Sequence, residues 1–139
     1  CVVAVDAATL SLLEISGSGA TWARDLGALS ELRVSGSGTV DVRGIDTGLL
    51  DAYISGSGDA ELAGDATQLR LDAAGSGNVD ARALDAKNVQ VRASGSGDVW
   101  ISASKSVDAR VSGSGDVEIY GDPGSTETDA TGSGSIIIH

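Results

Sequence analysis

Apolar and polar residues alternate over short stretches of this chain, and the alternation recurs around each copy of the tripeptide Gly-Ser-Gly. The residues two and four positions before its first glycine are mostly aliphatic or small, whereas the residue between them is polar at six of seven copies. The residues four and six positions after that glycine are again mostly aliphatic or small. A period of two is typical of a half-buried β-strand. Each repeat therefore predicts two strands that point their apolar side chains inward.

The Gly-Ser-Gly copies are spaced by 19, 20, 19, 20, 18 and 19 residues. Glycine has no Cβ and adopts positive φ readily, so the tripeptide predicts a corner between the two strands of each repeat. The five to seven residues left over in each repeat hold candidates for burial such as Leu26, Ile45 and Leu84, and we expect them to close the coil. The first glycines of the seven copies are Gly17, Gly36, Gly56, Gly75, Gly95, Gly113 and Gly132.

One such repeat cannot bury its apolar face alone, whereas stacked repeats form a continuous core. The sequence therefore predicts an all-β fold, a single-stranded parallel β-helix (solenoid) of about seven coils of 18–20 residues, forming one domain over residues 1–139. Six steps of about 4.8 Å give an axis of roughly 29 Å. Pro123 interrupts the pattern, and the segment 124–128 lacks strong aliphatic residues, which predicts a protruding turn there.

The composition indicates which residue types form the core and which classes of partner are excluded. Hydrophobic residues make up 41% of the chain but aromatic residues only 3%, so the core consists of Val, Ile, Leu and Ala. The net charge of −11 opposes binding to nucleic acid and to anionic lipid headgroups, and we expect neither as a partner. No apolar run approaches the roughly 20 residues of a membrane-spanning helix.

The two ends of a solenoid expose an apolar cross-section and unpaired strand edges. Because neither end of this sequence resembles a polar cap, we expect either a native chain that is longer at its N-terminus or a homodimer formed through the solenoid ends. Cys1 is the only cysteine, so it forms no internal disulfide. It is either the lipid-bearing residue of a processed lipoprotein or a truncation point, and the strand-like segment that follows it favours truncation.

A family resemblance rests on two features. The first is the run Ser-Gly-Ser-Gly-Asp-Val, which occurs at 94–99 and again at 112–117. The second is the ending, with Ile-Tyr-Gly-Asp-Pro at 119–123 and Gly-Ser-Gly-Ser-Ile at 132–136. From about Ser11 to Ile138 the chain resembles the putative autotransporter adhesin, head GIN domain family, which is similar to pectate-lyase-like β-helices. The resemblance implies a right-handed helix, a bacterial cell-envelope location that is periplasmic, cell-surface or secreted, and a role in adhesion. It supplies no catalytic residues.

Four aromatic residues are candidates for ligand binding. Trp22 and Trp100 occupy the same outward column of the repeat, roughly 19 Å apart at the expected coil spacing. Exposed tryptophan rings stack on sugars and mark binding surfaces, although solitary exposed aromatic residues also occur without function. Tyr53 is a weaker candidate for the same role, as is Tyr120.

Two polar columns at the corners admit a functional and a structural interpretation. Asp59, Asn78, Asp98 and Asp116 occupy one column, which either binds Ca²⁺ or accepts hydrogen bonds from nearby backbone N–H groups as Asx turns. We favour the second interpretation and expect no metal site. The serine ladder of the corners either presents hydroxyl groups to sugars or ice, or bonds coil to coil, and we again favour the structural role.

An enzyme is disfavoured because His139 is the only histidine, and no Ser-His-Asp or metal-ligand spacing can be assembled. Asp41, Glu61 and Asp80 lie on successive coils at a spacing that suits glycoside hydrolysis, but stacking alone produces that spacing. Nearby arginines are expected to pair with most outward carboxylates in solvated surface ladders.

We therefore expect a non-catalytic bacterial cell-envelope module for adhesion or for binding a glycan or protein at a surface, without a cofactor. The alternative is a structural module that self-associates through its solenoid ends. A polysaccharide-degrading enzyme is the less favoured third hypothesis.

Overall fold

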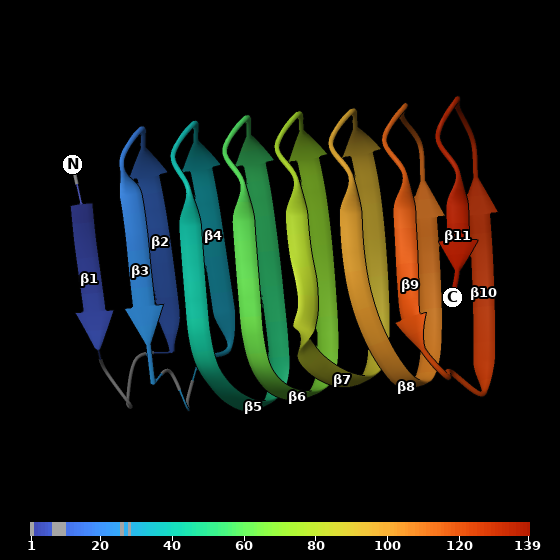
Figure 1. Ribbon diagram of the computed structural model, residues 1–139, viewed down its shortest axis with the longest axis horizontal. Coiled ribbons are helices and arrows are strands. Elements are labelled where there is room, and N and C mark those ends of the chain that lie inside the picture. Colours follow the sequence, from blue (N-terminus) through green and yellow to red (C-terminus); the bar gives the residue numbers. More distant parts are fainter. Residues whose placement is uncertain (1, 7–10, 26, 28) are drawn as a thin grey trace.

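The computed structural model describes residues 2–6, 11–25, 27 and 29–139 (Figure 1). Among the sequence-based expectations, those on Cys1 and Leu26 lie outside the described residues. None of the described residues belongs to a helix long and apolar enough to cross a membrane.

The described chain is a β-solenoid of parallel strands, as predicted. Each strand hydrogen-bonds to the equivalent strand of the neighbouring coil, so strands that pair are separated by a whole repeat in sequence. The strands are β1 (Val2–Asp6), β2 (Leu12–Gly17), β3 (Ala20–Arg24), β4 (Glu31–Gly36), β5 (Val40–Gly56), β6 (Ala60–Gly75), β7 (Val79–Gly95), β8 (Val99–Val111), β9 (Val117–Gly121), β10 (Ser125–Ala130) and β11 (Ile136–Ile138).

The strands form two facing layers (Figure 1). We call front layer the set β1, β3, the first halves of β5–β8, β9 and β11, and rear layer the set β2, β4, the second halves of β5–β8, and β10. The front strands run downward, the rear strands run upward, and successive coils advance from left to right. This arrangement makes the solenoid right-handed, in agreement with the resemblance.

The register between coils confirms the predicted inward columns. Leu13 pairs with Leu32, and Ile15 with Val34, and the same columns continue coil by coil through the rear layer. In the front layer, the inward column that starts at Ala23 is fully buried from β3 through β9. In this column the residue of the last described coil, Ile138, is exposed.

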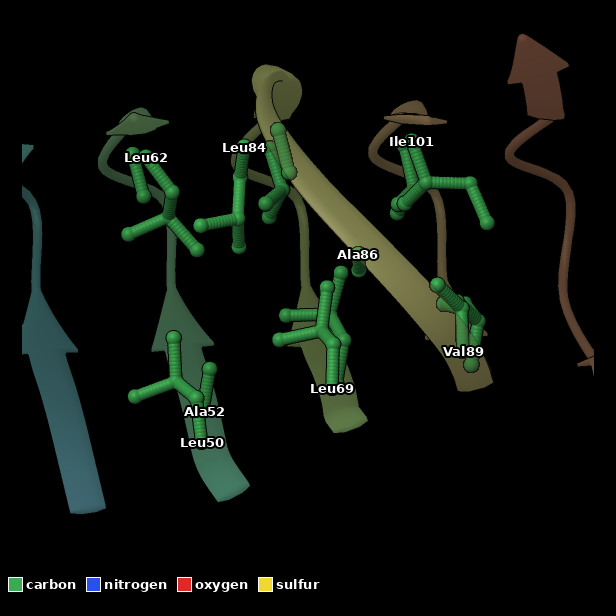
Figure 2. Close-up of a cluster of buried hydrophobic side chains, with 14 of the residues drawn as sticks. Leu50, Ala52, Leu62, Leu69, Leu84, Ala86, Val89 and Ile101 are labelled. Atoms are coloured by element: carbon green, nitrogen blue, oxygen red, sulfur yellow. The ribbon is translucent and has the colours of Figure 1, made fainter. Parts of the chain in front are cut away.

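The core is one continuous column of aliphatic side chains between the layers. Figure 2 shows side chains of successive coils lying in rows along the solenoid axis, and Leu50, Leu69 and Val89 form one such row in register. That row, six positions before the corner, was not among the predicted columns. Of the candidates for burial in the closing segment, Ile45 and Leu84 are 1% and 0% exposed.

From the second Gly-Ser-Gly corner onward, both glycines stack on their counterparts in the preceding coil. A Cβ on Gly36 would overlap the carbonyl oxygen of Gly17, and one on Gly38 would overlap that of Gly19. Positive φ adds a second requirement at several first glycines, for example +119° at Gly36. The close contact with the preceding coil is therefore the reason that glycine recurs at every corner from the second onward.

The structure corrects two predictions about the segments between the corners. In the central coils the closing segment is not a separate turn, because β5, β6 and β7 bend without a break from the front to the rear layer. The protruding turn predicted after Pro123 is also wrong over most of its length. Ser125–Ala130 forms β10, which pairs in register with β8, because its backbone hydrogen bonds do not depend on aliphatic side chains.

Candidate functional site

Three of the four aromatic residues predicted for ligand binding lie on two opposite surfaces. Trp22 in β3 and Trp100 in β8 belong to one outward column of the front layer, with three acidic residues between them in the register. Tyr53 lies in the second half of β5 and projects from the outer surface of the rear layer. No single site therefore contains all three.

Trp100 is engaged by a neighbouring ion pair. The Arg82 guanidinium carbon lies 5.8 Å from the Trp100 ring centroid and 5.9 Å from that of Tyr120, within reach of a cation–π attraction. Arg82 also binds Asp80, with Nη2 2.6 Å from Oδ2, and these hydrogen bonds hold the pKa of Asp80 below its usual value. The half-buried Trp100 ring thus already has a cationic neighbour from its own chain.

Glu118, Tyr120 and His139 complete what we call the front cluster, together with Arg82 and Trp100. The Tyr120 hydroxyl donates to Glu118 Oε2 at 2.8 Å, and His139 Nε2 lies 2.8 Å from the same oxygen. The Tyr120 and His139 rings stack with centroids 4.4 Å apart. The hydrogen bond from Tyr120, followed by that of His139, lowers the pKa of Glu118, and the same bond to Glu118 raises the pKa of Tyr120. The polar groups of this cluster therefore largely satisfy one another.

The three carboxylates considered for glycoside hydrolysis are all paired with arginine. Arg43 lies 2.8 Å from Asp41 and 3.3 Å from Glu61, while Arg82 holds Asp80. A glycosidase needs one carboxyl group with a raised pKa as general acid, and the lowered pKa of Asp80 runs in the opposite direction. The arrangement is that of a surface ion-pair ladder.

The column of Asp and Asn at the corners forms a hydrogen-bonded ladder between coils. Asp59 Oδ1 accepts the backbone N–H of Asn78 at 2.9 Å, and Asn78 Oδ1 accepts that of Asp98 at 3.0 Å. Asp98 and Asp116 continue the pattern at 2.9 and 2.8 Å. The predicted acceptance of backbone N–H bonds is confirmed, but the bonds are not the Asx turns expected, because each one joins residues of successive coils. Over the described chain, no group of three or more His, Cys, Asp or Glu is arranged to hold a metal ion.

The serine ladder contributes mainly through its backbone. The N–H groups of Ser57, Ser76 and Ser96 donate to glycine carbonyls of the preceding coil at 2.9–3.0 Å. One hydroxyl contact joins two ladder serines, from Ser96 Oγ to Ser76 Oγ at 3.4 Å. Bonding from coil to coil is thus present, but the hydroxyl groups carry little of it.

A hollow of about 830 Å³ opens on the outer surface of the rear layer, across β4–β7. Tyr53 lies in it with 50% of its surface exposed, between Arg33 and Asp72 in the register. We call it the rear hollow. It is lined by Glu31, Arg33, Asp51, Ala52, Tyr53, Arg70, Leu71, Asp72, Gln90 and Arg92.

A second rear hollow of about 340 Å³ adjoins the first and shares Asp72 and Arg92 with it. It extends toward β10 and adds hydroxyl groups and a further arginine to the lining. Its other lining residues are Ala93, Ser94, Arg110, Val111, Ser112, Asp129 and Thr131.

The arginines of the rear layer are not all neutralised. Arg33 binds Glu31 at 2.6 Å and Arg110 lies 3.3 Å from Asp108, but Arg70 and Arg92 form no ion pair with another described residue. The expected surface ladders therefore exist in part. Neither the hollows nor these exposed guanidinium groups were predicted, because the sequence shows which residues are neighbours and not how their side chains turn.

Known proteins share the sequence pattern and the fold of this chain. Residues 1–123 match the family described as "Putative auto-transporter adhesin, head GIN domain". A search of the curated proteins found no match. Among solved structures, a "putative adhesin" from Bacteroides fragilis NCTC 9343 is similar, with 27% identity, a TM-score of 0.72, and coverage of 91% of this chain and 61% of that one.

A second solved structure shares the fold. It is a "putative lipid binding protein" from Parabacteroides distasonis ATCC 8503, with 23% identity, a TM-score of 0.84, and coverage of 99% of this chain and 56% of that one. This chain therefore spans about three fifths of the length of both solved proteins.

Proposed function

Since this chain belongs to the putative auto-transporter adhesin, head GIN domain family, we propose that it is a non-catalytic binding module of the bacterial cell envelope that attaches to a glycan. The observation that carries the proposal is the exposed ring of Tyr53 in the rear hollow, surrounded by hydrogen-bonding side chains. Sugar rings stack on aromatic faces, and a concave site with a few polar groups fixes their orientation. The similarity to a structure named as an adhesin supports the same role.

The rear hollow is a better binding site than the front cluster. Arg82 lies over Trp100, and the carboxylate of Glu118 is already bonded, so a ligand would have to displace contacts within the protein. Trp22 is 39% exposed but stands four coil steps from Trp100. Tyr53, by contrast, has neighbours that point into an open hollow.

A role in self-association through the solenoid ends is the second candidate function. The observation in its favour is the exposure of Ile137 and Ile138, which are 41% and 51% exposed at the C-terminal end of the described solenoid. Exposed apolar groups favour association with a second chain.

The test is a panel of neutral and acidic polysaccharides, read for bound protein and for released sugar in the same wells. We expect binding without release, and we expect Tyr53→Ala to abolish most of it. Trp100→Ala and Trp22→Ala, on the opposite layer, serve as matched aromatic controls and should retain binding. Circular dichroism checks that each variant is folded.

The outcomes separate the candidates. Loss of binding in Trp22→Ala or Trp100→Ala with retention in Tyr53→Ala would move the site to the front layer. Released oligosaccharides would contradict the non-catalytic role. A concentration-dependent dimer that binds none of the polysaccharides would favour self-association instead.

A further inference from the structure

We propose that the two rear hollows form one groove that binds a linear polysaccharide bearing carboxylate groups, with Arg92 and Arg110 as the carboxylate-binding pair. The proposal rests on the proposed function and names the class of its ligand. A sugar ring of the same polysaccharide would stack on Tyr53.

The groove runs along the solenoid axis. The rear hollow and the second rear hollow share Asp72 and Arg92, so they are continuous. Together they cross the rear strands from β4 to β10, which are neighbours in the layer (Figure 1). Five coil steps of about 4.8 Å give a length of about 24 Å, which suits a polymer rather than a single sugar.

Two like charges lie opposite each other in this groove. Arg92 in β7 and Arg110 in β8 are register neighbours, and like charges in directly opposite positions destabilise a sheet. Arg110 is held by Asp108, whereas Arg92 is exposed and forms no ion pair with another described residue. A carboxylate between the two guanidinium groups would remove the repulsion and accept charge-assisted hydrogen bonds from both.

The remaining lining favours a ligand whose carboxylates are separated by uncharged groups that bear hydroxyls. Asp72 and Asp129 flank the arginine pair in the same register column, so a densely charged polyanion would meet two carboxylates within a few steps. The same carboxylates accept hydrogen bonds from sugar hydroxyls. Ser94 and Thr131 of the second rear hollow add hydroxyl groups that bond to ring substituents. These features fit a polyuronate better than a polyphosphate or a sulfated chain.

The experiment measures the affinity of the full chain for polygalacturonate, dextran and inorganic polyphosphate by biolayer interferometry. We expect polygalacturonate to bind most tightly and Arg92→Gln to weaken it by about tenfold, the value of one charge-assisted hydrogen bond. Arg43→Gln removes the same charge from the front layer and should change the affinity by less than about twofold. Thermal unfolding of both variants controls for folding.

Each other result overturns the proposal in a distinguishable way. Equal affinity for dextran and polygalacturonate, lost in Tyr53→Ala, would leave a glycan site without the carboxylate preference. Equal weakening by Arg92→Gln and Arg43→Gln would reduce the effect to general electrostatics. Tightest binding to polyphosphate would refute the ligand class, and binding to none of the three together with no binding across the wider panel would remove the proposed function as well.

Discussion

Gly77→Ala tests whether close stacking of the corners holds the solenoid together. Gly77 is the second glycine of its corner and does not have positive φ, so the substitution probes the contact alone. A Cβ there would overlap the carbonyl of Gly58 in the preceding coil. The corner that contains Gly77 must then move away from the corner of the preceding coil.

The expected cost follows from what this movement disturbs. Forcing an extra carbon into a packed contact costs about 1–3 kcal/mol. The movement also stretches two backbone bonds to the Gly56 carbonyl, from Ser76 N–H at 2.9 Å and from Gly77 N–H at 3.3 Å, each worth about 1 kcal/mol at most. We expect the free energy of unfolding to fall by about 2–4 kcal/mol, equivalent to a Tm lower by roughly 10 °C.

The assay is thermal and urea unfolding followed by circular dichroism. Ser76→Ala, between the two glycines of the corner, is the control, because its exposed side chain should change the free energy of unfolding by less than about 0.5 kcal/mol. Gly75→Ala combines the same kind of overlap with a φ of +120° and should be the most destabilised of the three. If Gly77→Ala unfolds at the same midpoint as Ser76→Ala, the stacking argument is wrong.

Substitutions at three further positions test other parts of the fold. Asn78→Ala removes the acceptor of the Asp98 N–H and should lower the free energy of unfolding by about 1 kcal/mol in urea, whereas Asn78→Asp keeps an acceptor and should lose less. Leu62→Ala empties a fully buried position and should cost about 2–5 kcal/mol by the same measurement. Arg82 lowers the pKa of Asp80, so the stability from this pair is complete above the unfolded pKa and is lost as pH falls through the folded pKa. Urea midpoints measured below about pH 4 should therefore fall more steeply in the native protein than in Asp80→Asn, and parallel curves would contradict this.

The inward columns were predictable because stacking imposes one rule on every coil. A side chain that points inward lies directly on its counterpart in the next coil. Because Leu32 is apolar, its register partner Ala52 must also be apolar, and so must the next one, Leu71. The alternation in sequence records this requirement, and the register follows from it. The Gly-Ser-Gly corners were predictable for the same reason, since both glycines recur where backbones meet.

The bends between the two layers were harder to predict, because their buried side chains are small and the number of residues in a bend differs from coil to coil. Ala66 and Ala86 are buried in the bends, yet alanine in an irregular segment does not distinguish a strand from a turn. The variation of 18–20 residues in the repeat is taken up by register shifts near the bends, such as the one between Val42 and Ile45. Hydrogen bonds between coils continue through the bend and keep it in strand conformation.

The candidate site was predictable only in its aromatic members. Tyr53 stands out in the sequence as the one ring in an outward column of charged residues. The hollow around it depends on the orientation of long side chains, which spacing does not determine. Whether an arginine pairs with the carboxylate beside it is decided by the same orientation, and Arg33 and Arg92 differ in this respect although both lie in that outward column.

The contrast between inward and outward columns indicates where function can lie in a solenoid. Every inward position is constrained by the coils on both sides, so its residue reports on stacking and on nothing else. An outward position has no such constraint, and a departure there from the simple alternation of opposite charges needs its own explanation. The adjacent arginines Arg92 and Arg110 are such a departure, because two opposed positive charges weaken the sheet that carries them. A bound carboxylate that relieves this repulsion is the explanation that we propose for the pair.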